Sequence, residues 1–201
     1  GFAILMYGME AMSGAVAPLA DNEKFTGILT MFSNPILGLL AGTILTAVIQ
    51  SSSASVGILQ ALCATGAVNF STALPIIMGQ NIGTCVTAII SSIGTSKNAK
   101  RAAAVHLFFN ISGTVIFMVV FYTLNTFVHF SFLNTAASPA GIAVIHSLFN
   151  IGATILLFPF ANLLEKMAIL AIPDKGSEVE EMEEEKINPD LARLDERFLD
   201  K

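Results

Sequence analysis

Apolar side chains fill two long stretches of this chain, and charged side chains are confined to the segments around them. Residues 35–96 and 102–164 contain no Asp, Glu, Lys or Arg. A transmembrane helix needs about 20 predominantly apolar residues, so each stretch is long enough for two or three crossings. The pattern predicts an all-α membrane protein built from transmembrane helices.

The lengths of the apolar segments and the position of the basic residues predict a topology. The charged cluster between the two stretches is basic and spans residues 97–101. Basic loops stay on the cytoplasmic side. We therefore expect a multi-pass protein of the cell (inner) membrane, with loop 97–101 and the C-terminal tail in the cytoplasm and an outer loop at 126–138. The expected crossings are residues 1–19, 73–93, 102–125 and 139–164.

The segment 35–68 is too short for two further crossings. Its 34 residues fall below the roughly 40 that two full passes need. We therefore expect a re-entrant hairpin, which enters the membrane halfway and returns on the same side. The middle of the segment, at residues 50–55, forms its expected tip.

The expected tip carries polar side chains in an otherwise apolar segment. Such groups are tolerated at membrane depth where they contact protein or line a water-filled cavity. Free N–H groups at the start of the second hairpin helix attract an anion. Hydroxyl and amide oxygens suit a hard cation such as sodium, for which Gln50 and Ser53 are the candidate ligands. The residues predicted to bind a small anion beside sodium are Gln50, Ser51, Ser52, Ser53 and Ser55.

A second polar interruption, Gly-Gln-Asn-Ile-Gly-Thr at residues 79–84, lies in the next crossing. Transporters place broken helices at binding sites near the middle of the membrane. We therefore predict a discontinuous helix whose Gln80, Asn81 and Thr84 join the site. Close packing of helices is the alternative, and we favour it for the glycines alone: Gly38, Gly42, Gly79 and Gly83.

The last two crossings share a repeated pattern. Residues 105–114 resemble residues 145–154, with His, Asn and Thr at every fourth position in both. These residues therefore share one face of each helix. The face either lines a polar pathway, with His106 and His146 as proton-sensitive groups, or forms hydrogen bonds that pin two antiparallel helices together. We favour the second interpretation, because neither apolar stretch contains an acidic partner.

Composition supports a membrane protein with a polar tail. Of all residues, 54% are hydrophobic and 12% are charged, whereas soluble domains carry about 25% charged residues. Twelve of the 15 acidic residues follow Leu164. We expect a transmembrane transport domain at residues 1–172. Residues 173–201 are expected to form an acidic linker and the start of a cytoplasmic helical domain that is cut short.

Other classes of function find little support in the sequence. A basic footprint for nucleic acid is absent. The serine run lacks the Gly-x-Ser-x-Gly pattern of a nucleophile elbow, and no His or Cys spacing suggests a metal centre. We interpret Cys63 and Cys85 as small core residues. The sequence therefore predicts no enzymatic activity and no cofactor, with sodium serving as a coupling ion.

The two polar interruptions together resemble the bacterial branch of the type II sodium/phosphate cotransporters. The residues that carry the resemblance are Gln-Ser-Ser-Ser-Ala-Ser at 50–55 and Gly-Gln-Asn-Ile-Gly-Thr-Cys-Val-Thr-Ala at 79–88. The resemblance covers about residues 1–170. Residues 194–199 are similar to the lead into the PhoU-like cytoplasmic domain of bacterial members.

In that family two inverted repeats each supply a Gln-Ser-Ser-Ser tip, and the pair enclose phosphate and sodium. The resemblance implies that inorganic phosphate binds at Gln50 and residues 51–53, beside Asn81 and Thr84. It identifies this chain with the second repeat, which is one half of an inverted-repeat transporter. The first repeat then belongs to a longer polypeptide of which this is a fragment, or a second copy replaces it.

Two functions are consistent with these observations. The first is sodium-coupled symport of inorganic phosphate across the lipid bilayer, in the direction of either uptake or export. The second is a non-transporting membrane anchor that presents a PhoU-like regulatory domain in phosphate homeostasis. The acidic tail and the helix signals after it motivate the second function.

Overall fold

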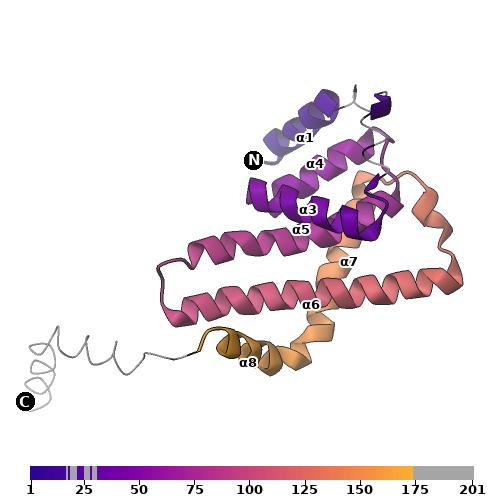
Figure 1. Ribbon diagram of the computed structural model, residues 1–201. Helices are drawn as coiled ribbons and strands as arrows, with labels where there is room; N and C mark the ends of the chain where they lie inside the picture. The colour runs from indigo at the N-terminus through magenta and orange to yellow at the C-terminus, as the bar shows by residue number, and fades with distance from the viewer. Residues whose placement is uncertain (17, 19–21, 25–27, 29–30, 174–201) are drawn as a thin grey trace, which may run out of the picture.

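A computed structural model describes residues 1–16, 18, 22–24, 28 and 31–173 of the chain, and within these residues the regular elements are helices (Figure 1). Three segments are long and apolar enough to cross a membrane: α5, α6, and the run from α7 through α8. The predicted all-α membrane fold is confirmed. The described elements are α1 (Phe2–Val16), α3 (Pro35–Ile49), α4 (Ser52–Ala64), α5 (Phe70–Ser91), α6 (Lys97–Val128), η2 (Ser131–Asn134), α7 (Pro139–Leu157), η3 (Phe158–Phe160) and α8 (Ala161–Ala171).

Short polar side chains set where several helices begin. Asn34 accepts hydrogen bonds from the backbone N–H groups of the first turn of α3. Ser96 and Ser138 do the same for α6 and α7. These residue types are preferred at helix starts because their side-chain oxygens satisfy N–H groups that lack an intrahelical partner. Pro139 follows its cap at the first helical position, where its missing N–H costs nothing.

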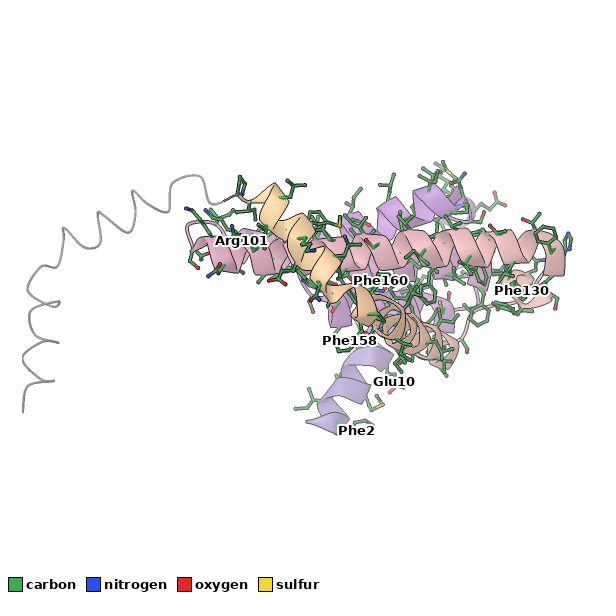
Figure 2. All side chains as sticks on the ribbon, turned by 90° about the horizontal axis from the view of Figure 1, so that it is seen from below. Phe2, Glu10, Arg101, Phe130, Phe158 and Phe160 are labelled. Carbon is green, nitrogen blue, oxygen red and sulfur yellow. The ribbon has the colours of Figure 1, made fainter. Side chains whose placement is uncertain are left out.

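Helices α3 and α4 form the predicted hairpin, and the turn between them lies at residues 50 and 51. They contain 15 and 13 residues, so at about 1.5 Å per residue each falls short of the roughly 30 Å hydrocarbon core. Their depth in a membrane stays a prediction. Helix α1 lies beside α4, and its Phe2 end projects away from the main bundle (Figure 2).

Helices α3 and α5 pack backbone against backbone through glycines. A methyl group added at Gly42 would overlap the carbonyl oxygen of Ile76, and one at Gly79 would overlap that of Leu39. At Gly83 it would lie 2.5 Å from the carbonyl oxygen of Thr43. The packing interpretation of the glycines is therefore confirmed.

The predicted discontinuous helix is wrong. Helix α5 runs unbroken from Phe70 to Ser91 through the polar interruption at residues 79–84. Glycine weakens a helix in water because it exposes the backbone and loses conformational freedom. Here α3 covers that backbone, and the hydroxyl of Thr43 donates to the carbonyl oxygen of Gly79 at 3.1 Å. Close packing thus stabilises a helical segment that the sequence pattern indicated as a break.

The bundle brings the basic segment and the end of α8 together. Helix α5 is followed by a short loop and the long α6, and α8 lies along α6 (Figure 1). Arg101, near the start of α6, donates two hydrogen bonds to the carbonyl oxygen of Ile172, at 3.1 and 2.9 Å (Figure 2). The predicted acidic linker and helix start at residues 174–201 lie outside the described residues.

Replacing Arg101 by methionine is expected to loosen the end of α8. The change keeps much of the aliphatic stem but removes two charge-assisted hydrogen bonds to one helix-terminal carbonyl oxygen, worth about 1–2 kcal/mol for a half-exposed donor. Amide hydrogen exchange across residues 168–172 should accelerate roughly tenfold, as 1.4 kcal/mol corresponds to a factor of ten. Lys100→Met, at an exposed neighbouring position, is the control. Equal exchange in both variants would show that the contact carries no stability.

Candidate functional site

The hairpin turn is built from two residues with different backbone conformations. Gln50 lies in the left-handed region, with φ 57° and ψ 23°, which is uncommon for a residue other than glycine. Its backbone N–H donates to the carbonyl oxygen of Thr46 at 2.7 Å and closes α3. Ser51 is extended, and its hydroxyl oxygen accepts from the N–H of Ala54 at 3.3 Å. The turn therefore ends one helix and caps the next within two residues.

A buried network holds the turn against α5. The hydroxyl of Thr46 donates to Oγ of Ser55 at 2.8 Å, and Nε2 of Gln80 donates to the same Oγ at 2.9 Å. All three side chains are fully buried. Because Thr46 and Ser55 lie on opposite arms of the hairpin, these two bonds fix both arms to each other and to the middle of α5.

The same network contains an unsatisfied polar atom. Oε1 of Gln80 is buried and accepts no hydrogen bond from any residue that the structure describes. Exchanging the amide nitrogen and oxygen would leave Nε2 unpaired instead, because only one amide atom reaches Ser55. Buried polar groups are almost always paired in folded proteins. Gln80 Oε1 is therefore an exception among the buried polar atoms of the described residues.

A polar pocket of about 290 Å³ lies next to this network, where α4, α5, α6 and α7 meet. In the described part of the chain its lining includes no Asp, Glu, Lys or Arg. A larger groove of about 610 Å³ between α3 and α4 is lined by apolar side chains, so it offers an ion nothing to bind. The polar pocket is lined by Ser52, Asn81, Thr84, His106, Phe109, Asn110, His146 and Asn150.

The pocket side chains are held by their own helices. Nδ2 of Asn81, Asn110 and Asn150 donates to the carbonyl oxygen four residues earlier, at 3.0, 3.0 and 2.8 Å. The hydroxyl of Thr84 makes the equivalent bond at 2.9 Å. Each group thus uses one hydrogen within its helix and keeps its oxygen for another partner. These amides and this hydroxyl therefore present fixed, uncharged polar atoms to the pocket.

The structure divides the predicted site residues into three groups. Ser52, Asn81 and Thr84 line the pocket, whereas Ser55 and Gln80 belong to the buried network behind it. Gln50 and Ser51 form the turn, with Ser51 capping α4, and Ser53 lies in the first turn of α4; Gln50 and Ser53 are exposed.

The sequence analysis missed part of this arrangement. Thr46, which completes the buried network, sits in an apolar run without a neighbouring polar residue as a signal. The α6 and α7 sides of the pocket did carry a signal, the repeated His and Asn. The hydrogen bonds that we favoured between those two helices are not formed among the described residues, because Asn110 and Asn150 bond within their own helices. The polar-lining interpretation fits the structure instead.

Comparisons with known proteins give matches over most of the chain. The family model described as Na+/Pi-cotransporter matches residues 4–138. The uncharacterized protein YqeW of Bacillus subtilis is 30% identical over 177 residues, which cover 87% of this chain and 56% of that protein. This chain therefore spans little more than half the length of that relative.

Mammalian transport proteins match a shorter part. Sodium-dependent phosphate transport protein 2A of Rattus norvegicus is 39% identical over 113 residues, covering 53% of this chain and 17% of that protein. Protein 2B of Homo sapiens is 37% identical over 97 residues, covering 45% and 14%. No solved structure matches the chain significantly.

Proposed function

Because this chain belongs to the Na+/Pi-cotransporter family, we propose that it moves inorganic phosphate across a membrane together with sodium. The observation that carries the proposal is the uncharged polar pocket in an otherwise apolar bundle, beside the hairpin turn. Polar side chains inside a membrane protein are costly and mark substrate or ion pathways. The matched mammalian relatives are named as transport proteins, and a transport role needs no catalytic group.

The start of α4 supplies the phosphate contact. The first N–H groups of a helix have no intrahelical partner and carry partial positive charge, which favours an anion. Ser52 opens α4 and lines the pocket, so its hydroxyl can donate to the same phosphate oxygen. Asn81 and Thr84 border the bound anion from α5. Ser51 acts indirectly, because its side chain is occupied in capping α4.

We propose that sodium binds behind the turn, at Oε1 of Gln80, which no described residue pairs. Hard cations take oxygen ligands, and this oxygen is already desolvated. Gln50 and Ser53 are the sodium ligands predicted from the sequence. Both are exposed near the turn and therefore offer sodium a less enclosed site. Sodium bound at Gln80 would stiffen the network through Ser55 and so fix the start of α4 for phosphate. Binding of each ion would then favour binding of the other, as linkage requires.

Replacing Ser52 by alanine tests the phosphate contact. Loss of one hydrogen bond to a charged group costs about 1.5 kcal/mol, so the KM for phosphate should rise roughly tenfold. Uptake of radiolabelled phosphate by proteoliposomes under a sodium gradient measures it. Ser53→Ala, one residue further and exposed, should leave KM unchanged. Equal KM values for Ser52→Ala and the unmodified protein would show that phosphate does not bind in this pocket. That result would favour the membrane-anchor function instead.

The rest of the transporter is a separate part of the proposal. This chain matches a little over half of its bacterial relative, and it contains one Gln-Ser-Ser-Ser run. We therefore expect transport to require a second repeat, supplied by additional polypeptide or by a second copy. Proteoliposomes that contain residues 1–201 alone distinguish the two, because sodium-dependent flux from this chain by itself requires pairing of copies.

A further inference from the structure

The repeated segments of α6 and α7 place two histidines in the pocket. His106 and His146 occupy equivalent positions in residues 105–114 and 145–154, and both line the cavity. The backbone carbonyl of each accepts a hydrogen bond from the asparagine one turn later, at 3.0 and 2.8 Å. The repeat therefore produces two matched parts of one binding surface, each with an imidazole and an amide.

Both imidazole rings are available to a ligand. They are half-buried, and neither ring makes a hydrogen bond or ion pair with another described residue. The other lining residues are serine, threonine, asparagine and phenylalanine, which do not ionise. Among the residues that line this pocket, these two histidines are therefore the side chains that can take up a proton and become positively charged.

Other ionisable groups on the packed helices lie elsewhere. Cys85 of α5 contacts the backbone carbonyl of His106, with its Sγ 3.6 Å from the oxygen, rather than the ring. Glu165 and Lys166 of α8 are exposed. Apart from His146, α7 contains no ionisable side chain. The remaining ionisable groups on α4 and α6 are Cys63, Lys97, Lys100, Arg101, Tyr122 and His129, none of which lines the pocket.

We propose that His106 and His146 bind phosphate in their protonated form, so that phosphate binding is linked to proton uptake by this pocket. The inference rests on the proposed phosphate transport and identifies a second coupling ion for it. An anion in a pocket without a fixed cation needs compensating charge. A protonated imidazole supplies a positive charge and donates from both nitrogens, and such charge-assisted bonds are about twice as strong as neutral ones.

The sign of the pH dependence follows from this arrangement. A proton passes from water to an imidazole nitrogen, and the resulting cation attracts phosphate. The contribution of each histidine to affinity therefore requires the protonated ring, so it is largest at acid pH and is lost as the ring releases its proton. Phosphate itself titrates in the same range, so a pH profile of the unmodified protein alone does not isolate the histidines.

The test compares phosphate KM between the full-length protein and its His106→Gln/His146→Gln variant in sodium-loaded proteoliposomes at several pH values. The KM of the variant is divided by the KM of the unmodified protein at each pH. This ratio cancels the effect of the titration of phosphate itself, which is the same for both proteins. We expect a ratio of roughly ten or more near pH 5.5 that falls to about one near pH 8.5. Each single variant should show part of the acid-side increase. His129→Asn is the matched control, because this third histidine is exposed at the left-handed end of α6, which asparagine tolerates.

The possible outcomes distinguish failure of the protonated-histidine proposal from failure of the phosphate transport function on which it rests. A ratio that stays the same at every pH overturns the protonated-histidine proposal, and so does a variant that loses flux uniformly across the range. Absence of sodium-dependent phosphate flux in the unmodified full-length protein at all pH values overturns the transport function itself. A ratio that declines from acid to alkaline pH, with His129→Asn unchanged, supports the proposal.

Discussion

Replacing Gly79 by alanine is expected to reduce phosphate flux on the order of a hundredfold. The added methyl group would overlap the carbonyl oxygen of Leu39, and a backbone atom of a packed helix cannot turn aside as a side chain can. Overpacking costs about 1–3 kcal/mol and more where no flexible group relieves it. Helix α3 must move away from α5, and this displaces the hairpin turn. In enzymes a misplacement of about 1 Å can cost a hundredfold in rate.

The matched control is Gly57, which lies on α4, the second arm of the hairpin. A methyl group added at Gly57 would meet the Cε atom of Met12 at 3.5 Å, which is an ordinary van der Waals contact with a flexible side chain. Gly57→Ala should therefore retain flux and thermal stability. Both variants are purified in the same detergent. Their melting temperatures are measured in detergent, and their phosphate flux is measured after reconstitution into proteoliposomes. Retention of flux by Gly79→Ala would mean that the α3–α5 contact does not position the site.

Replacing Gln80 by leucine is expected to abolish sodium dependence while leaving the protein about as stable as before. The change removes the hydrogen bond to Ser55, worth about 0.5–1.5 kcal/mol, but it also removes an unsatisfied buried oxygen that costs about 1–3 kcal/mol. The two effects offset each other in the absence of sodium. Sodium, in contrast, loses the buried oxygen that we propose as its ligand.

Two measurements distinguish a sodium ligand from a structural residue. Sodium should raise the melting temperature of the unmodified protein, because a ligand that binds only the folded state stabilises it, and this increase should vanish in Gln80→Leu. Gln60→Leu is the control, since Gln60 donates to the carbonyl oxygen of Pro139 at 3.0 Å and lies outside the site. A sodium-dependent increase that persists in Gln80→Leu would exclude Gln80 as a ligand.

The sequence was most informative where polar residues interrupt an apolar segment. The run at residues 50–55 predicted a hairpin tip, and the structure ends α3 at Ile49 and begins α4 at Ser52. The length of segment 35–68 and its polar middle were enough to place the turn, and serine is also a preferred helix cap. The crossings at residues 73–93 and 102–125 likewise overlap α5 and α6, because uncharged length is a direct measure of membrane span.

The prediction of a break in α5 failed because glycine has two structural roles. Glycine permits a break in a helix and also permits a neighbouring helix to approach, and only the partner decides between these uses. The partner of residues 79–83 is α3, which lies more than 30 positions earlier in the sequence. A pattern confined to residues 79–84 could therefore not distinguish a break from a packing surface.

The pocket was only partly predictable. Ser52, Asn81 and Thr84 were identified from their polar runs. The α6 and α7 residues were visible as a repeat but were assigned to hydrogen bonds between helices, because periodicity gives the face that residues share and not what that face meets. Knowing that α4 and α5 bring their own polar groups to the same place requires the packed structure.

The order in which the chain is synthesised gives the α3–α5 contact a further significance. The ribosome completes α3 and α4 before it makes α5, yet Gln80, which bonds Ser55, and the glycines that receive α3 belong to α5. Until α5 emerges, α3 lacks the glycine surface against which it packs, and Ser55 lacks its bond from Gln80. A chain interrupted before Gly83 should therefore be a substrate for quality-control proteases, whereas one extended past Ser91 has gained the partner that its earlier half lacks.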